Sequence, residues 1–274
     1  MTDKKYRLIK GDRIKLNGHT LYRIKALRDF GIVKKGDKGG YIEKEENLSH
    51  EGNCWVCINA RVYDNAQVCD NVKVYGNAII FDNARVYDNA YIRGNSRIYG
   101  HAQVYGNARI YGDAIIFENA KVYDHAKVYG NARIYLNANV YGNARVYDNA
   151  YIRGYSRIYG HAQVYGNART AMNTQVYGHA QVYGNARISY NGYIYGHAQL
   201  YGNARVHDYS AIYDNAQVYD NAYIRGALVY GNAQVFGHAY VYNNAQVHGN
   251  TKLCERLEGD KFIYNKPYKK YHKH

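Results

Sequence analysis

The chain of 274 residues lacks any long apolar run, and this absence sets the first limits on its class. No stretch approaches the roughly 20 apolar residues that a membrane-spanning helix needs. The first residues, Met1 to Arg7, also lack the apolar segment of a secretory signal peptide. We therefore expect a cytoplasmic protein with no membrane partner.

Cysteine is scarce as well, with four residues in the whole chain. Cys54 and Cys57 have the C-x-x-C spacing that many metal sites use. Side chains alternate along an extended strand, so these two thiols point to opposite sides, and Cys69 and Cys254 belong to other segments. The sequence therefore predicts reduced, structural cysteines, no metal site and no cofactor.

A six-residue repeat fills most of the chain. Its pattern is a small residue, any residue, Val or Ile, usually Tyr, then Gly or Asp, then Asn or His, as in residues 102–107. It runs from residue 60 to residue 222 in 28 repeats without an insertion, loses one residue near Gly226 and continues to Thr251. A fixed short period of this kind predicts coils that stack on one another, rather than a globular domain with an enclosed pocket.

Alternation along a strand explains the residue types in the repeat. The small residue and the Val or Ile point inward, whereas the variable residue and the Tyr point outward. The Gly or Asp followed by Asn or His is turn chemistry, because these residues tolerate the positive φ of a sharp corner. Three such sides close a triangular coil of three repeats, so the sequence predicts an all-β, single-stranded parallel β-helix of about 11 coils.

The repeat Ala102-Gln103-Val104-Tyr105-Gly106-Asn107 resembles the hexapeptide-repeat left-handed β-helix of many bacterial acyltransferases. Residues 38–43 and 48–56 are similar to the amino-terminal segment of YdcK-like bacterial proteins, which carry an acyltransferase label. The resemblance implies left-handed coils, association into homo-oligomers and acyl transfer as a candidate activity. Acyltransferases of this class build their sites from a His and projecting loops, and the 28 repeats contain no such loop.

The two ends depart from the repeat. We expect an amino-terminal cap over residues 1–50, a β-helix over 51–254 and a basic tail over 255–274. Asn17-Gly18 lies between apolar stretches and predicts a two-residue hairpin, which would shield the strand edges of the first coil. Residues 251–274 carry 7 basic and 3 acidic side chains, so the tail is a candidate contact for nucleic acid or an acidic surface.

Positions three repeats apart stack above one another, so each side is a set of ladders. One side carries a Tyr ladder, and a second combines Tyr with Gln, whose amides we expect to hydrogen-bond along the stack. The Tyr ladder of the first side is Tyr87, Tyr105, Tyr123, Tyr141, Tyr159, Tyr177, Tyr195, Tyr213 and Tyr230. The Gln ladder of the second side is Gln163, Gln181, Gln199, Gln217 and Gln234.

The third side departs from the pattern. Small residues at Ala171 and Ser189 predict a shallow depression surrounded by arginines, which offer bidentate donors to phosphate or carboxylate. Like charges stacked one coil apart are unfavourable unless an anion or a partner's acidic groups lie between them. The predicted ligand-binding residues are Arg153, Arg169, Arg187, Arg205, Arg225, His207, Tyr151 and Tyr190. An oligomer interface would account for the same pattern.

Three classes of function remain open at this point. The preferred one is a non-enzymatic scaffold, assembled as a homo-oligomer, that presents Tyr and Gln ladders and one Arg-rich side to an anionic ligand or an acidic protein surface. The alternative is an acyltransferase with His207 as its catalytic base. A third is a filament-forming or surface structural protein.

Overall fold

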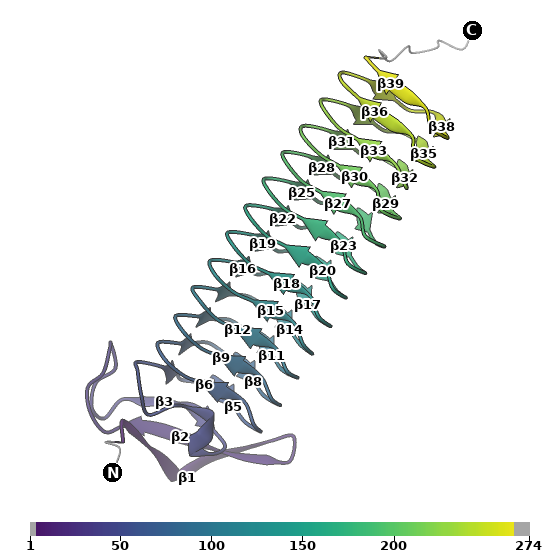
Figure 1. The fold of residues 1–274 in the computed structure, drawn as a ribbon. Helices are drawn as coiled ribbons and strands as arrows, with labels where there is room; N and C mark the ends of the chain where they lie inside the picture. Colours follow the sequence, from purple (N-terminus) through teal and green to yellow (C-terminus); the bar gives the residue numbers. More distant parts are fainter. Residues whose placement is uncertain (1–3, 266–274) are drawn as a thin grey trace. The chain divides into compact units, whose positions relative to one another are not determined.

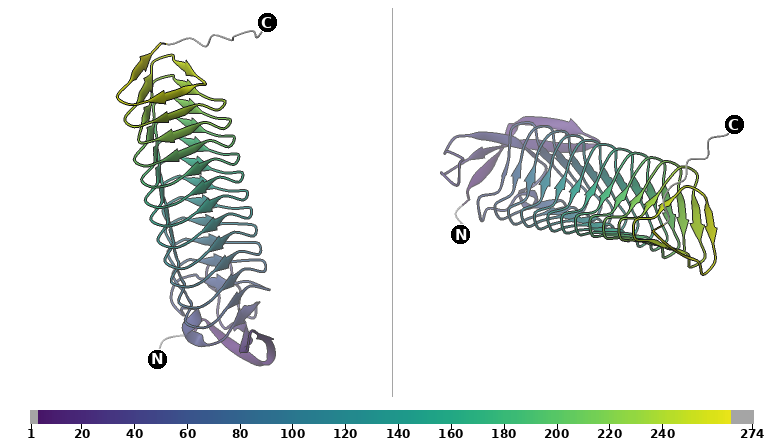
Figure 2. Two further views of the ribbon diagram at one scale, coloured as in Figure 1. Left: turned by 90° about the vertical axis from the view of Figure 1, so that its right-hand side faces the viewer. Right: turned by 90° about the horizontal axis from the view of Figure 1, so that it is seen from above.

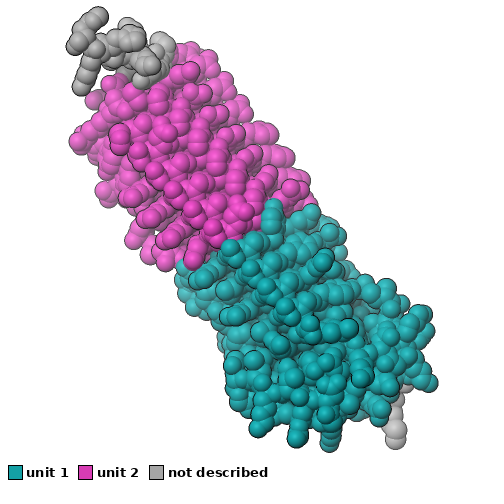
Figure 3. All heavy atoms as spheres, turned by 180° about the vertical axis from the view of Figure 1, so that it is seen from behind, with its two compact units in different colours: residues 1–137 teal, residues 138–274 magenta. Residues whose placement is uncertain are grey.

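A computed structural model describes residues 4–265 (Figure 1). The chain divides into two compact units, residues 1–137 and residues 138–274 (Figure 3). The described residues form strands and one short 3-10 helix, η1 (Glu45–Asn47). None of them belongs to a helix long and apolar enough to cross a membrane.

Unit 1 opens with a cap of three strands, β1 (Tyr6–Leu16), β2 (His19–Ala26) and β3 (Lys38–Ile42). The first two pair antiparallel around the predicted Asn17-Gly18 turn, whose two φ angles are 49° and 88°. The third strand was not predicted. It pairs antiparallel with β2 and parallel with β5 of the first coil, so it joins the cap to the repeats.

The repeats of unit 1 form three parallel sheets, named here by their first strands. The β5 sheet contains β5 (Arg61–Val62), β8 (Ile79–Ile80), β11 (Arg97–Ile98), β14 (Ile115–Ile116) and β17 (Arg133–Ile134). The β4 sheet contains β4 (Trp55–Val56), β7 (Lys73–Val74), β10 (Tyr91–Ile92), β13 (Arg109–Ile110) and β16 (Lys127–Val128). The β6 sheet contains β6 (Gln67–Val68), β9 (Arg85–Val86), β12 (Gln103–Val104) and β15 (Lys121–Val122).

Unit 2 is built in the same way. The β20 sheet contains β20 (Tyr151–Ile152), β23 (Arg169–Thr170), β26 (Arg187–Ile188), β29 (Arg205–His207), β32 (Tyr223–Arg225), β35 (Tyr240–Tyr242) and β38 (Arg256–Glu258). The β19 sheet contains β19 (Arg145–Val146), β22 (Gln163–Val164), β25 (Gln181–Val182), β28 (Gln199–Leu200), β31 (Gln217–Val218), β34 (Gln234–Val235) and β37 (Lys252–Leu253). The β18 sheet contains β18 (Asn139–Val140), β21 (Arg157–Ile158), β24 (Gln175–Val176), β27 (Tyr193–Ile194), β30 (Ala211–Ile212), β33 (Leu228–Val229), β36 (Gln246–His248) and β39 (Phe262–Tyr264).

Most of these strands are two residues long, and strands of successive coils lie side by side within each unit (Figure 2). In each two-residue strand of the repeats the second residue, usually Val or Ile, is buried, and the residue two positions earlier, usually Ala, is buried with it. Parallel partners are three repeats apart, as in Gln103↔Lys121. The predicted all-β parallel solenoid, with its inward and outward positions, is therefore confirmed.

The corners also follow the predicted turn chemistry. The fifth position of the repeat has positive φ, 65° at Gly106 and 56° at Asp124. An aspartate at this position offsets the cost of its positive φ with a hydrogen bond. Its carboxylate accepts from the backbone N–H of the next coil, as Asp88 Oδ2 does from Gly106 N at 3.0 Å. Asn side chains at the sixth position hydrogen-bond from coil to coil, for example Asn185 Nδ2 to Asn203 Oδ1 at 3.1 Å.

The solenoid is slightly longer than the repeat pattern predicts. Trp55-Val56 forms a strand before the first repeat, and β38 and β39 pair with β35 and β36 after the last one. The described residues thus make about 12 turns rather than 11, counted over both units. The basic tail does not begin at residue 255, because residues 256–258 and 262–264 belong to the solenoid. Residues 266–274, with much of the predicted tail, lie outside the described residues.

The deletion near Gly226 shortens one coil without breaking it. Strand partners before the deletion are three full repeats apart. Across it, Ala211 pairs with Leu228 and Tyr223 pairs with Tyr240, each one position short of that spacing. Gly226 absorbs the change with φ at 56° and donates its backbone N–H to His207 O at 3.3 Å. The ladders therefore stay aligned on both sides of the deletion.

Candidate functional site

The predicted ligand-binding residues lie on or beside one sheet of unit 2. The register of the β20 sheet runs Tyr151↔Arg169↔Arg187↔Arg205↔Tyr223, so these residues form one outward column. The residues two positions later in each coil form a second outward column, which contains Arg153, Ala171, Ser189, His207 and Arg225, and Tyr190 follows it at a corner. We call this surface, between β20 and β32, the Arg-rich face.

The arginines of this face are exposed and mostly without ion-pair partners. Arg225 is paired, because its Nε lies 2.6 Å from Asp208 Oδ2. Arg169 lies over the ring of Tyr151, with its guanidinium carbon 5.2 Å from the ring centroid, a cation–π contact. Within residues 4–265, the other three arginines have no carboxylate oxygen within 4.0 Å. These three are Arg153, Arg187 and Arg205.

The predicted depression contains a hydrogen-bonded pair that sequence reasoning did not find. Ser189 Oγ lies 2.6 Å from His207 Nδ1, one coil apart, and Ala171 beside them is 8% exposed. Burial lowers the pKa of His207, and the nearby Arg205 and Arg225 lower it further, while Asp208 acts in the opposite direction. The imidazole is therefore neutral at pH 7, and its ring stacks on Tyr223 at 5.2 Å between centroids.

An exposed row of large side chains borders the Arg-rich face. It lies at one corner of four successive coils, where other coils have Gly, Asp or Asn. Its members are Tyr155, Met172, Tyr190 and Tyr209, which are 63%, 47%, 50% and 72% exposed. We call them the corner row.

Three members of the corner row have a backbone conformation that favours glycine. Met172, Tyr190 and Tyr209 have φ of 53°, 51° and 59°. Side chains with a Cβ pay roughly 1–2 kcal/mol for this region, and Asn or Asp tolerates it best. The hydrogen bonding of these corners differs too, since Asn191 N donates to Met172 O of the preceding coil rather than to the following one. Residues with such a strained backbone conformation are more frequent at functional sites than elsewhere in proteins.

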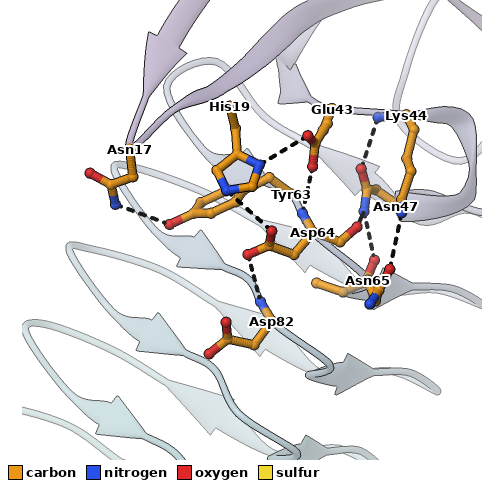
Figure 4. A network of polar contacts seen from close by, with 10 residues as sticks. Asn17, His19, Glu43, Lys44, Asn47, Tyr63, Asp64, Asn65 and Asp82 are labelled. Carbon is orange, nitrogen blue, oxygen red and sulfur yellow. Dashed lines mark hydrogen bonds and ion pairs between the residues drawn. The ribbon is translucent and has the colours of Figure 1, made fainter.

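A second polar cluster ties the cap to the first coil (Figure 4). His19 of β2 lies between two carboxylates, with Nδ1 3.0 Å from Glu43 Oε1 and Nε2 3.3 Å from Asp64 Oδ1. Glu43 also accepts a hydrogen bond from the backbone N–H of Asp64 at 2.7 Å. The hydrogen bond to Glu43 raises the pKa of His19. Burial of the ring lowers this pKa, but the charge of Asp64 raises it further, so the net shift is upward.

These three residues are close enough for one metal ion, but their orientation fits an ion-paired imidazolium better. The two carboxylates face opposite nitrogens of the ring, so each ring N–H has its own acceptor. No sequence pattern indicated this cluster, because His19 lies in the hairpin, Glu43 follows β3 and Asp64 is a repeat corner.

The cysteines lie as the alternation predicts. Cys54 is fully buried, and Cys57 is partly exposed on the opposite side of the strand. Lys5, itself fully buried, donates from Nζ to Cys54 Sγ at 3.1 Å and to the carbonyl of Glu51 at 3.0 Å. Burial lowers the pKa of Lys5 and raises that of Cys54, so this contact is a structural one beneath the cap.

The aromatic ladders are present in each unit, but the Gln ladder differs from the prediction. Tyr rings stack at 4.8 Å in unit 1, as between Tyr87 and Tyr105, and at 4.9 Å in unit 2, as between Tyr177 and Tyr195. In the described chain the Gln side chains do not bond to one another; Gln163 Oε1, for example, accepts from Tyr147 Oη at 3.3 Å. The amide ladder exists instead at the Asn corners, where shorter side chains point along the stack.

Comparison with known proteins identifies the repeat. A protein-family model described as the YdcK β-solenoid repeat matches residues 102–118, 180–196, 198–214 and 233–249. No curated protein matches the chain. The matched segments include β26 and β29, which contribute Arg187, Arg205 and His207 to the Arg-rich face.

Proposed function

Because the chain is a YdcK-like β-solenoid repeat protein, we propose that it is a non-enzymatic scaffold whose Arg-rich face binds an anionic ligand or an acidic partner surface. One observation carries the proposal. Exposed arginines occupy neighbouring strands of the β20 sheet, and three of them have no carboxylate partner among residues 4–265. Adjacent strands are about 4.8 Å apart, so these charges repel one another until an anion lies between them.

The corner row supports a partner larger than a single ion. Tyr, Met and Arg are enriched in the buried centres of protein interfaces, where Lys and Glu are depleted. Tyr190 and Tyr209 combine high exposure with a strained backbone, which stability alone does not explain. An acidic protein surface would contact both the arginines and this row.

The test is a charge-reversal variant with a matched control. Arg169, Arg187 and Arg205 are replaced by Glu, and binding to poly-L-glutamate and to inorganic polyphosphate is measured at low and high salt. The control replaces three exposed cations of the other two sheets of unit 2 by Glu, which gives the same net charge. These are Arg145, Arg157 and Lys252.

We expect the wild-type protein to bind in a salt-sensitive way, and the Arg-rich-face variant to bind at least 10-fold more weakly. The control variant should lose less than 2-fold in affinity for the same polyanions. Equal losses in both variants would mean that net charge alone attracts the polyanion, and the proposal would then be wrong.

The Ser189–His207 hydrogen bond favours acyl transfer as the second candidate. A neutral imidazole beside a hydroxyl is the arrangement of a general base and its proton donor. Backbone N–H groups of the coil, such as Ser189 N to Val206 O at 3.0 Å, are engaged between strands, so they do not supply an oxyanion hole. Turnover of acetyl-coenzyme A that disappears in His207→Ala would establish this activity, and turnover that survives would exclude His207 as its base.

A further inference from the structure

A second basic site lies in unit 1 and shares no residue with the Arg-rich face. A groove of about 520 Å³ follows the corner and outer surface of β7, β10 and β13 in the β4 sheet. Lys73, Arg93 and Arg109 line it together with Tyr91 and Tyr111. The volume is within the range of roughly 300–1,000 Å³ that is typical of small-molecule sites.

An inverted repeat lies in the wall of the groove. Most repeats place a polar residue before the buried aliphatic and Tyr after it, as in Arg109-Ile110-Tyr111, whereas the repeat that contains β10 reads Tyr91-Ile92-Arg93. The ring of Tyr91 leans out of its column towards the two neighbouring tyrosines. Its centroid lies 5.2 Å from that of Tyr75 at an interplanar angle of 36°, and 6.0 Å from that of Tyr111 at 54°.

This lean leaves space in the column that Tyr91 shares with Lys73 and Arg109. The register pairs Tyr91 with both cations, one on each side. In a regular ladder the rings stack almost parallel, with an angle of 3° between Tyr87 and Tyr105. The hollow therefore lies where one repeat exchanges two residue types and the ring of Tyr91 tilts.

The groove contains donors without acceptors of opposite charge. Acidic side chains are absent from its lining, and within residues 4–265 none of its three cations has a carboxylate oxygen within 4.0 Å. The Asn ladder also ends here. Asn71 Nδ2 donates to Asn89 Oδ1 at 3.1 Å, but among the described residues no acceptor pairs with Asn89 Nδ2. Lys and Arg only donate hydrogen bonds, so the site favours a ligand rich in oxygen acceptors.

We propose that this groove binds an anionic sugar, meaning a sugar ring that carries a phosphate or a carboxylate. The three cations would hold the anionic group, the amides of Asn89 and Asn107 would hydrogen-bond the hydroxyls, and the tilted ring of Tyr91 would contact the face of the sugar. The inference concerns unit 1 alone and does not rest on the function proposed for the Arg-rich face.

The experiment is a residue exchange that conserves composition and charge. Tyr91→Arg combined with Arg93→Tyr restores the order of β13, so the variant should fold as its neighbours do. The matched control makes the opposite exchange, Arg145→Tyr with Tyr147→Arg, in a regular repeat of the β19 sheet of unit 2. Binding of glucose 6-phosphate, glucuronate, glucose and inorganic phosphate to the full chain is measured by isothermal titration calorimetry.

We expect glucose 6-phosphate and glucuronate to bind wild type and control alike, and to bind the exchanged variant at least 10-fold more weakly. Glucose and inorganic phosphate should each bind at least 10-fold more weakly than the anionic sugars, because each offers only part of the required groups. The proposal is overturned if the exchange has no effect, if phosphate alone binds as well as the sugar phosphate, or if neither anionic sugar binds.

Discussion

Each residue of a repeat can be compared with the residues at the same position in more than 30 similar repeats of the chain. The comparison separates residues that every coil needs from residues that only one surface has. Ala, Val and Ile recur at inward positions because the coil has room for little else. Thr170 breaks this rule at an inward position, and Met172, Tyr190 and Tyr209 replace the Gly, Asp or Asn of regular corners beside the Arg-rich face. These exceptions are visible in the sequence, but the strained φ angles and the Ser189–His207 bond depend on backbone and rotamer geometry that no pattern encodes.

Replacing Thr170 by Val should stabilise unit 2. Thr170 is fully buried between the aliphatic residues Ile152 and Ile188, and its Oγ1 has no hydrogen-bond partner among the described residues. Removing an unsatisfied buried hydroxyl should raise the free energy of unfolding by about 1 kcal/mol, seen as a higher midpoint in urea. Val182→Thr, the reverse change in a regular coil, should lower it. A lower midpoint for Thr170→Val would contradict this reading of the site.

Replacing Tyr190 by Gly should separate stability from binding. Glycine restores the residue of regular corners and removes the cost of φ at 51°, so the free energy of unfolding should rise by up to about 1 kcal/mol. Loss of the exposed ring should weaken binding of poly-L-glutamate at the Arg-rich face several-fold. Urea unfolding and a binding titration on the same sample measure both effects. A variant that is less stable would show that the ring stabilises its own corner.

At the scale of elements, the repeats were predictable and their junction with the cap was not. Period and alternation fix the strand, corner and inward face of each repeat, since every coil meets an equivalent neighbour. β3 and η1 do not pack against copies of themselves, so their positions depend on single contacts. Gly40, for example, lies where an added Cβ would clash with the backbone oxygen of Ala60. The groove at β10 was missed for a related reason, because the inverted order of Tyr91 and Arg93 was visible but the tilt of the ring was not.

The contact between cap and first coil should depend on pH. The pKa of His19 is raised in the folded protein, so its ion pairs contribute fully below about pH 6.5 and are lost as the pH rises through the folded pKa. His19→Gln should therefore lower the free energy of unfolding by about 0.5–1 kcal/mol near pH 6, and by less at pH 9.

Thermal unfolding of wild type and variant from pH 5.5 to 9 gives the difference directly. The exposed corner substitution His238→Gln in unit 2 serves as the control. A difference that grows with rising pH would have the wrong sign for an imidazolium held by Glu43 and Asp64.

For the whole molecule, the net charge of +14 is divided very unevenly. Residues 1–50 and 251–274 carry most of the excess, and the repeats between them have 16 basic and 12 acidic side chains. The Arg-rich face is therefore a local concentration of positive charge on repeats whose net charge is small. For this reason the salt dependence of ligand binding at that face can be assigned to particular residues.

We expect the protein to be a homo-oligomer whose mass does not change when Arg169, Arg187 and Arg205 are replaced by Glu. In that case the Arg-rich face is free for its ligand in the assembled protein. Light scattering with mass determination, at low and at high salt, makes the measurement. An oligomer that dissociates in the variant would instead make this face a contact between subunits.

The fixed spacing of three repeats per coil also limits how such a gene can change its length. Gain or loss of one full coil within a unit leaves every later side chain on the sheet it had before, so the protein can grow or shrink by that step without redesign. A gain of a single repeat satisfies the local pattern equally well, yet it moves each later ladder to the next side. The segments beginning at Tyr91 and Tyr151 are near-copies ten repeats apart, and ten repeats are not a whole number of coils. The same Tyr-Ile-Arg order thus occurs on two separate surfaces, in a groove on one and beside an arginine column on the other.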